Sequence, residues 1–156
     1  TGEKSVERLA DFADFMIDVS PDKPIVDRWV HERRVQGLET TGRAVAQLPI
    51  CWDRDRDRAV KRAHEQFRWF GGGWPTNAEL PNSKAFGAAT RFVRPEDVAE
   101  QIPCGDDIGA VVQAVRTYRE AGFTDIALVQ IGGDSQDNFF DEAVPTLLAE
   151  LRADAA

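Results

Sequence analysis

Residues 104–134, CGDDIGAVVQAVRTYREAGFTDIALVQIGGD, decide the fold that we predict for this chain. The first half of this stretch has apolar residues at helical spacing, and Asp106 or Asp107 can cap that helix. Gly122 ends the helix, and residues 124–131 then form a strand that is apolar on both faces. A strand of this kind, preceded by a helix, is typical of a parallel sheet covered by helices. It runs into a glycine-rich turn, and ligands bind in such loops at the carboxyl ends of parallel strands.

The same alternation of helix and strand precedes this stretch. A short helix leads to a strand at 15–19 (FMIDV), and a second helix leads to a strand at 43–52. Asp53 follows and is placed to cap a third helix. Three glycines then interrupt the periodicity, so we expect 71–93 to be an irregular excursion with one turn of helix near Phe86. The other expected helices cover residues 6–13, 23–36, 95–101 and 138–152.

The repeated units predict an α/β protein with a parallel sheet and right-handed crossovers, organised as a single segment over 1–156. A chain of this length buries roughly 70% of its unfolded surface. Three parallel strands cannot close a barrel, and their outer edges would be apolar templates for other strands. Either the chain dimerises through these edges or it is a piece of a larger α/β protein. We favour the second, because the sequence opens without Met and becomes helical almost at once.

Composition and charge exclude several classes of partner. The formal net charge is −8, and an acidic surface repels phosphate backbones, so we expect no nucleic-acid partner. No apolar run is long enough to span a bilayer and no targeting segment is recognisable, so we expect no membrane partner and a cytoplasmic location. The basic run at 54–68 alternates with acidic residues, which indicates a salt-bridged helix face.

Metal-binding and nucleophilic motifs are not recognisable in the sequence. Cys51 and Cys104 lie far apart without a CxxC partner, which predicts buried thiols rather than a metal site or a redox motif. His31 and His64 are the only histidines, and both fall on predicted helices away from strand ends. We therefore expect both to be solvated and assign no metal ligand. No serine has the context of a nucleophile elbow.

Short segments along nearly the whole chain carry a family likeness. They are LADFADFMIDVS at 9–20, PICWD at 49–53, AHEQ at 63–66, IPCGDD at 102–107, AGFTDI at 121–126 and QIGGD at 130–134, with Phe139 and Phe140 beyond. Together they resemble the C-terminal part of the luciferase-like flavin and deazaflavin oxidoreductases. The branch they resemble is coenzyme F420-dependent and is related to the F420-dependent glucose-6-phosphate dehydrogenases.

The resemblance implies a TIM (β/α)8 barrel of roughly twice this length, in which this chain supplies strands six to eight and their helices. It also implies an oxidoreductase, active when intact, that transfers a hydride between deazaflavin F420 and an organic alcohol or carbonyl substrate. We expect the intact enzyme to be a homodimer with a small-molecule substrate. The alternative within the same fold is an FMN-dependent luciferase-like monooxygenase, because the residues that contact the ring lie largely upstream.

The resemblance also suggests site residues. Thr1 and Gly2 match the loop after strand five, whose backbone amides hold the cofactor's phosphate region, a role that suits a helix N-terminus. Ser20, Trp52 and Gln130 end predicted strands and are the expected substrate-cavity residues. Each has an ordinary alternative: a helix cap, packing against the following helix, and a structural hydrogen bond, respectively. The family's catalytic histidine and acidic proton donor come from earlier strands, so no catalytic residue is assigned and the chain alone is expected to be inactive.

Two departures from the family pattern bear on the substrate. Relatives that use sugar phosphates have basic residues after strand six and in the excursion, where this chain has Asp22 and Gly87, with Lys23 and Lys84 only as neighbours. We therefore do not expect glucose 6-phosphate as the substrate. The aromatic residues around the three glycines form either a lid over the site or a loop packed on the barrel exterior.

An alternative of another class is a small, non-enzymatic α/β binding module, such as a receiver domain. A receiver needs clustered acidic residues at its first strand end and a lysine at its last. Here Asp18 stands alone and Gln130 occupies the late strand end, so this alternative is disfavoured.

Overall fold

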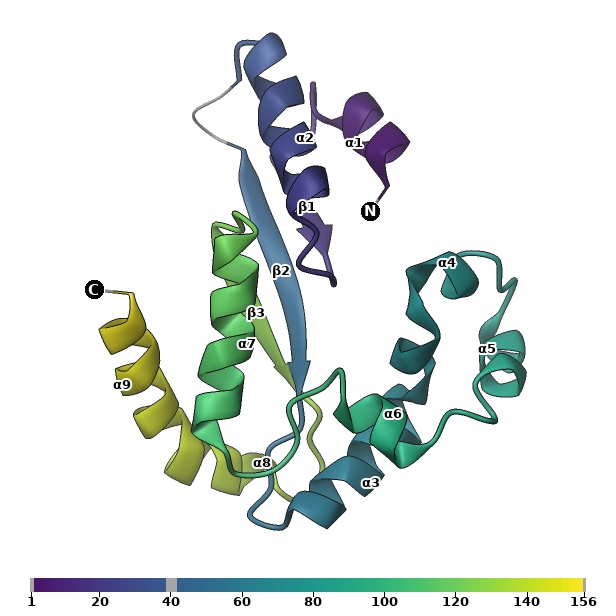
Figure 1. Cartoon of the computed structure of the whole chain (residues 1–156), viewed down its shortest axis with the longest axis vertical. Helices are drawn as coiled ribbons and strands as arrows, with labels where there is room; N and C mark the ends of the chain where they lie inside the picture. The colour runs from purple at the N-terminus through teal and green to yellow at the C-terminus, as the bar shows by residue number, and fades with distance from the viewer. Residues whose placement is uncertain (1, 39–41, 156) are drawn as a thin grey trace. The chain divides into compact units, whose positions relative to one another are not determined.

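The computed structural model describes residues 2–38 and 42–155, with only the backbone described at 74 and 75. Helices and strands alternate along the chain as the sequence predicts (Figure 1). The strands are β1 (Phe15–Asp18), β2 (Arg43–Ile50) and β3 (Asp125–Gln130). The helical elements are α1 (Glu3–Leu9), α2 (Lys23–Val35), α3 (Arg56–Phe67), η1 (Arg68–Gly72), α4 (Gly73–Asn77), α5 (Ser83–Ala89), α6 (Pro95–Ala99), α7 (Ile108–Glu120), α8 (Gln136–Asn138), η2 (Phe139–Ala143) and α9 (Val144–Asp154).

The three strands form one parallel sheet in the order β1-β2-β3. β1 pairs with β2 in a register that runs from Phe15 opposite Arg43 to Asp18 opposite Ala46. Each crossover between strands contains helix, as parallel connections require. The predicted parallel α/β sheet is therefore confirmed.

The chain divides into two compact units, and the division falls within β2, α7 and β3. The first unit holds residues up to 48 together with 113–129, and the second holds 49–112 together with the residues from 130 on. Each unit has its own buried residues and is described by itself.

In the first unit, α1 and α2 lie side by side, and Trp29 of α2 is almost fully buried. Asp22 caps α2 by accepting from the Ile25 amide at 3.3 Å, and a proline follows in the first turn. Burial alternates along β1: Met16 is buried, whereas Phe15 and Ile17 are 51% and 43% exposed. One face of β1 is therefore covered, and the other presents large apolar side chains to solvent.

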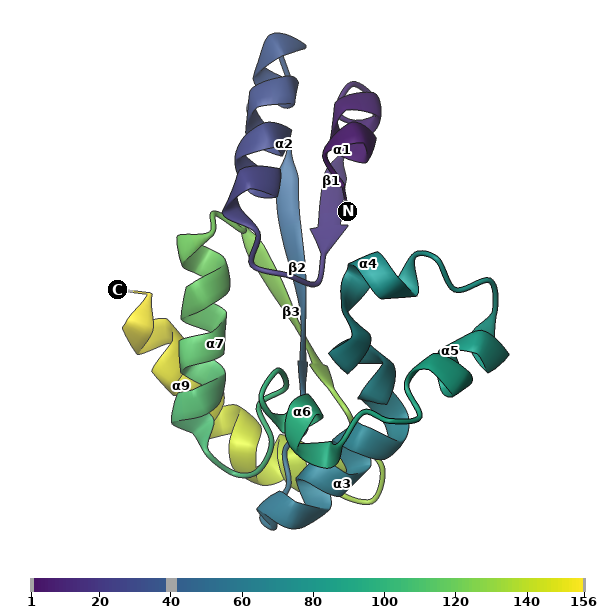
Figure 2. The same ribbon diagram turned by 45° about the vertical axis from the view of Figure 1, so that its right-hand side comes forward.

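The second unit is built around a small apolar cluster. α3 packs against α6, and the excursion that carries α4 and α5 leaves the end of α3 and returns at α6 (Figure 2). The excursion holds two helices rather than the single expected turn near Phe86. The buried members of the cluster are Cys51, Ala59, Ala63, Val98, Ile102 and Ile131.

Helix boundaries confirm some predicted caps and correct one. Asp107 accepts from the Ala110 amide at 3.1 Å in the first turn of α7, and α7 stops just before Gly122, whose φ of +98° favours glycine. The prediction that Asp53 caps the third helix is wrong. Asp55 is the cap, because its carboxylate accepts from the Asp57 and Arg58 amides at 2.9 and 3.3 Å. The terminal helix is also interrupted, since a π-helical turn, η2, precedes α9.

Candidate functional site

The carboxyl ends of β2 and β3 lie in the second unit, where residues at and after these ends form two sets of hydrogen bonds, here called together the carboxyl-end network. The position matters because parallel α/β folds bind ligands at this end of their strands. Two of the three predicted cavity residues belong to it. Its members are Cys51, Trp52, Asp53, Arg62, Gln130, Asp134 and Ser135.

The Gln130 side chain hydrogen-bonds to both the amide and the carbonyl of the Trp52 backbone. Its Oε1 accepts from the Trp52 amide at 3.0 Å, and its Nε2 donates to the Trp52 carbonyl at 3.2 Å. The Ser135 hydroxyl donates to the same carbonyl at 3.2 Å. The amide orientation of Gln130 is fixed by this pattern, since only one orientation serves a donor and an acceptor together. The structure thus gives the Gln130 side chain a structural bond, while its predicted role in a substrate cavity stays a prediction.

Trp52 itself is buried, with 5% of its surface exposed. Its ring lies 6.2 Å from the ring of Phe139, centroid to centroid, at an interplanar angle of 52°. This tilted arrangement is a favourable aromatic contact. The indole therefore packs inside the second unit, and its expected place in a substrate cavity stays a prediction.

A buried ion pair links the end of β2 to α3. Arg62 donates through Nη2 to Asp53 at 2.7 Å and to Asp134 at 2.9 Å. Arg62 and Asp53 are 9% and 4% exposed, whereas Asp134 is exposed. Arg58 reaches Asp134 at 3.0 Å and Asp53 at 3.5 Å. Two arginines of one helix therefore bridge the loop after β2 and the loop after β3.

The electrostatics of this pair follow from its surroundings. Burial acts to raise the pKa of Asp53, but the Asp55 amide and the Arg62 guanidinium stabilise the carboxylate, and the net pKa is lowered. Burial acts to lower the pKa of Arg62, but its hydrogen bonds to Asp53 and Cys51 outweigh that effect, and the net pKa is raised. Both groups are therefore held in their charged forms.

Sequence reasoning missed Arg62, Asp134 and the pairing of the two cysteines. A signal for Arg62 was present: it lies three residues after Ala59 and beside Ala63, the two buried alanines of α3, so it shares their face. Cys51 forms a single parallel bridge with Cys104, which follows α6. The Cys51 amide donates to the Pro103 carbonyl at 2.9 Å, and the Gly105 amide donates to the Cys51 carbonyl at 3.0 Å.

The other predicted site residues lie in the first unit. Gly2 is exposed and precedes α1, and its carbonyl accepts from the Ser5 and Val6 amides at 2.9 and 3.1 Å. Thr1 lies outside the described residues. Ser20 is exposed, its amide donates to the buried carboxylate of Asp18 at 3.1 Å, and its carbonyl accepts from Asp22 at 2.8 Å. The helix cap at this point is Asp22, not Ser20.

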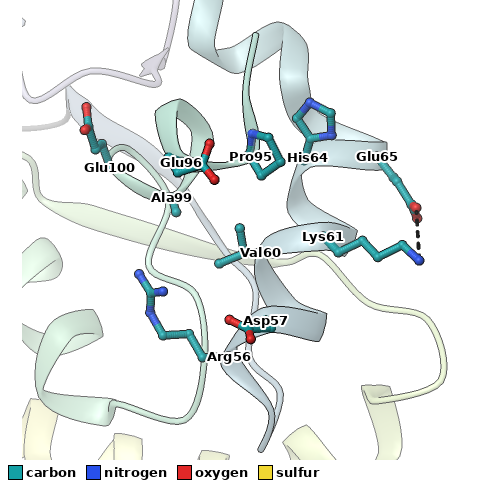
Figure 3. A pocket seen from close by; sticks show the side chains of 10 residues that line it. All are labelled: Arg56, Asp57, Val60, Lys61, His64, Glu65, Pro95, Glu96, Ala99 and Glu100. Carbon is teal, nitrogen blue, oxygen red and sulfur yellow. Dashed lines mark ion pairs between the residues drawn. The ribbon is translucent and has the colours of Figure 1, made fainter.

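Two surface pockets of similar size lie in the second unit, away from the carboxyl-end network. The first, of about 650 Å³, lies between α3 and α6 and has charges of both signs (Figure 3). Lys61 pairs with Glu65, one turn further along α3, at 4.0 Å, and His64 Nε2 lies 2.8 Å from the Val93 carbonyl. Neither histidine lies at a strand end, as predicted, and His31 is exposed. His64 is partly buried, so the expectation that both are solvated is wrong for it.

The second pocket, of about 660 Å³, lies where the excursion folds back on the end of α3. Trp69, Leu80 and Phe86 give it apolar walls, and Arg68 provides a charge. The Trp69 ring also contacts the rings of Phe67 and Phe70 at 5.4 and 5.8 Å. The lining of this second pocket suits an alkyl or aromatic group, because several of its walls are large apolar side chains.

Within residues 2–38 and 42–155, no three His, Cys, Asp or Glu side chains converge as a metal ion requires. Over the same residues, no helix has the length and apolar character needed to cross a membrane.

Comparison with known proteins places the fold. No family model and no curated protein matches the chain. Among solved structures, an F420-dependent secondary alcohol dehydrogenase in complex with an F420-acetone adduct is similar, with a TM-score of 0.71 and 17% identity over 94% of this chain. The coenzyme F420 dependent tetrahydromethanopterin reductase from Methanopyrus kandleri is also similar, with a TM-score of 0.65 and 17% identity over 94% of this chain.

The share of each solved structure that is matched is equally informative. The chain covers 46% of the alcohol dehydrogenase and 49% of the reductase, so it spans about half the length of each. Both structures are luciferase-like TIM barrels, and the match includes the parallel sheet. The expected fold class is therefore confirmed: this chain has the fold of part of a luciferase-like (β/α)8 barrel.

Proposed function

We propose that this chain is part of a coenzyme F420-dependent oxidoreductase that transfers a hydride between the deazaflavin and an organic alcohol or carbonyl compound. The observation that carries the proposal is the structural likeness over 94% of the chain to two enzymes whose names both state F420 dependence. The short segments that resemble the F420-dependent branch support it independently. Together they favour F420 over FMN.

Gly2 offers a test of whether the chain fits the cofactor. Its backbone is extended, and no atom lies within 4 Å of where a side chain would begin. The space at the Cβ position of Gly2 is therefore open, and amides at a helix start attract anions. We propose that Gly2, with Thr1 before it, contacts the phosphate region of the cofactor.

The carboxyl-end network supports the proposal in a different way. Bound F420 would supply the hydride chemistry, so the protein's task is to hold the reacting groups in place and exclude water. Gln130, Ser135 and Arg62 each tie the segment after β2 to another part of the second unit. We propose that this hydrogen-bonded loop forms one side of the substrate cavity, with Trp52 and Gln130 in its wall. Ser20, in the first unit, is proposed separately as a polar substrate contact.

The intact enzyme is proposed to be a cytoplasmic homodimer. Because the histidine and acidic proton donor of the resembled family come from earlier strands, we assign no catalytic residue to this chain. We expect the chain alone not to reduce F420. Measurable turnover with an alcohol by the purified 156-residue protein would contradict that expectation.

Titration of the full chain with F420, followed by the fluorescence of the deazaflavin, tests the proposal. We expect saturable binding, and weaker or no binding of FMN in a parallel titration. Binding of FMN alone would shift the proposal to an FMN-dependent enzyme. If neither compound binds either this chain or a longer protein that contains it, the proposal fails.

A matched pair of variants tests the role of Gly2 separately. Asp and Asn are both favourable residues before a helix, but only Asp adds a negative charge. We expect Gly2→Asp to weaken F420 binding by about fivefold relative to Gly2→Asn, through repulsion of the phosphate. Equal affinities for the two variants would remove Gly2 from the site and leave the proposed function standing.

A further inference from the structure

The two cysteines of the chain are brought together by the fold. Cys51 and Cys104 are directly opposite each other in a parallel bridge, with backbone hydrogen bonds of 2.9 and 3.0 Å beside it. Backbones paired in this way lie about 4.8 Å apart, which falls within the range of about 4.4–6.8 Å that a disulfide requires between its Cα atoms. Both cysteines are free thiols in this structure.

The two cysteines differ in solvent exposure and in their charged neighbours. Cys51 is fully buried in the apolar cluster of the second unit, whereas Cys104 is partly exposed. Arg62 Nη1 lies 3.8 Å from the Cys51 sulfur. A small oxidant can therefore reach Cys104, while the guanidinium favours negative charge on Cys51.

The two thiols also differ in pKa, in opposite directions. A hydrogen bond from the Cys104 thiol lowers the pKa of Cys51, with help from Arg62 and against the effect of burial. The pKa of Cys104 is raised, because its thiol is the donor in that bond and because it is partly buried. Cys51 Sγ in turn donates to the Ile131 carbonyl at 3.4 Å, so both cysteines are thiols that hydrogen-bond in series.

We infer that Cys51 and Cys104 are a redox-active pair, which a peroxide converts to a reversible intrachain disulfide at the carboxyl end of β2. Cys104, the accessible sulfur, loses its proton as it attacks the peroxide and becomes a sulfenic acid. The Cys51 sulfur then attacks the Cys104 sulfur and displaces that oxygen as water. Two S–H bonds and the O–O bond break, and one S–S bond forms. The sulfurs lose two electrons, and hydrogen peroxide is reduced to two molecules of water that carry away both protons.

The disulfide would act on the candidate site through the chain. Cys51 precedes Trp52, whose backbone is held by Gln130 and Ser135. The new bond would close a loop of about 50 residues that contains α3, the excursion and α6, which restricts the unfolded chain strongly. The inference rests on the cysteine geometry alone and not on the proposed function.

Peptide mapping of the full chain tests the inference. The native protein is treated with hydrogen peroxide, alkylated, and digested with trypsin without reduction. We expect peptides 44–54 and 92–116 to appear linked, with both thiols lost together, the mass of two hydrogen atoms lost, and full recovery after dithiothreitol.

The control variant is Cys104→Ser, which keeps a polar group of similar size at the partly exposed position. We expect its Cys51 thiol to stay reduced under the same treatment, because burial excludes the oxidant. Should this variant fail to fold, the coupled loss of the two thiols in the unmodified chain still decides the question. Oxygen addition to Cys104 with Cys51 still free, a disulfide between two chains, or no reaction would each overturn the inference.

Discussion

Two aspartate–arginine pairs lie at opposite ends of β2, and they differ in almost every physical respect. At the start of the strand, Arg43 donates to Asp125 through both Nε, at 2.9 Å, and Nη2. After its end, Arg62 donates to Asp53 at 2.7 Å. The Arg43 and Asp125 side chains are 63% and 35% exposed, whereas those of Arg62 and Asp53 are 10% and 5% exposed.

The difference shows that ideal geometry and energetic importance are separate properties. The Arg43–Asp125 pair has the better, two-pronged geometry, but water screens it and competes for both partners. The Arg62–Asp53 pair is shielded, so loss of Asp53 leaves the buried Arg62 with only the exposed carboxylate of Asp134 as an ionic partner. The chain therefore depends on the pair at the carboxyl end, which belongs to the candidate site, more than on the pair at the amino end.

Removal of a partner from the buried pair is the strongest way to challenge this comparison. We expect Asp53→Ala to lower the free energy of unfolding by about 3 kcal/mol, because Arg62 stays buried with only Asp134 and Cys51 beside it. Urea denaturation, followed by circular dichroism, measures the loss. The matched control is Asp125→Ala at the other end of the strand, and a larger loss for the control would reverse the comparison.

The hydrogen bond from the Trp52 amide to Gln130 provides a second test at the carboxyl end of β2, and it involves no ion pair. Gln130→Leu keeps most of the side-chain volume but leaves the Trp52 amide without its side-chain acceptor, so we expect about 2 kcal/mol of destabilisation. Hydrogen exchange at the Trp52 amide should accelerate in this variant. Gln130→Glu keeps the acceptor and serves as the control for the amide, whose protection it should preserve better than the leucine variant.

Acid should affect the exposed pair in a narrow range of pH. The hydrogen bond and charge of Arg43 lower the pKa of Asp125 to about 2 in the folded protein. An unfolded aspartate has a pKa of about 3.9, so the contribution of Asp125 is complete above that value and is lost as the pH falls toward 2. We expect the stability difference between the unmodified chain and Asp125→Asn to shrink over this interval. A difference that stays constant from pH 5 to pH 2 would show that the pair does not stabilise the fold.

Added salt should produce the smallest of these changes in the free energy of unfolding. Exposed pairs are screened within about 10 Å at 0.1 M ionic strength, whereas buried pairs are screened much less. Addition of sodium chloride should therefore remove the already small effect of Asp125→Ala and leave that of Asp53→Ala nearly unchanged. Denaturation of both variants at low and high salt measures this, and equal sensitivity to salt would contradict the assignment of burial.

The sequence predicts features that depend on local pattern. The spacing of apolar residues before Gly122 locates α7 and β3 within a few residues, since a helix stripe and a glycine stop are local signals. Asp107 as a cap follows from the same reasoning. The parallel direction of the strands also follows, because a helix between two successive strands is the connection that a parallel pair requires.

Features that depend on distant partners were not predictable in the same way. The sequence DRDRD at 53–57 offers three aspartates for one helix cap, and local spacing does not choose among them. Asp53 is diverted from capping by Arg62, and Asp55 caps instead. The pairing of Cys51 with Cys104 depends on how the segment after α6 returns to β2, which no local pattern encodes. A polar residue at 130 indicates that some partner exists, but the identity of the partner comes only from the fold.

The two hydrogen bonds between the Gln130 side chain and the Trp52 backbone also make the end of β2 sensitive to deamidation of Gln130. Hydrolysis of the side-chain amide replaces its NH₂ group with an oxygen, so an atom that donates to the Trp52 carbonyl would become one that repels it. No bond of the main chain breaks and the shape hardly changes. Loss of this one functional group would thus weaken the bond to the Trp52 carbonyl and leave the bond from the Trp52 amide in place.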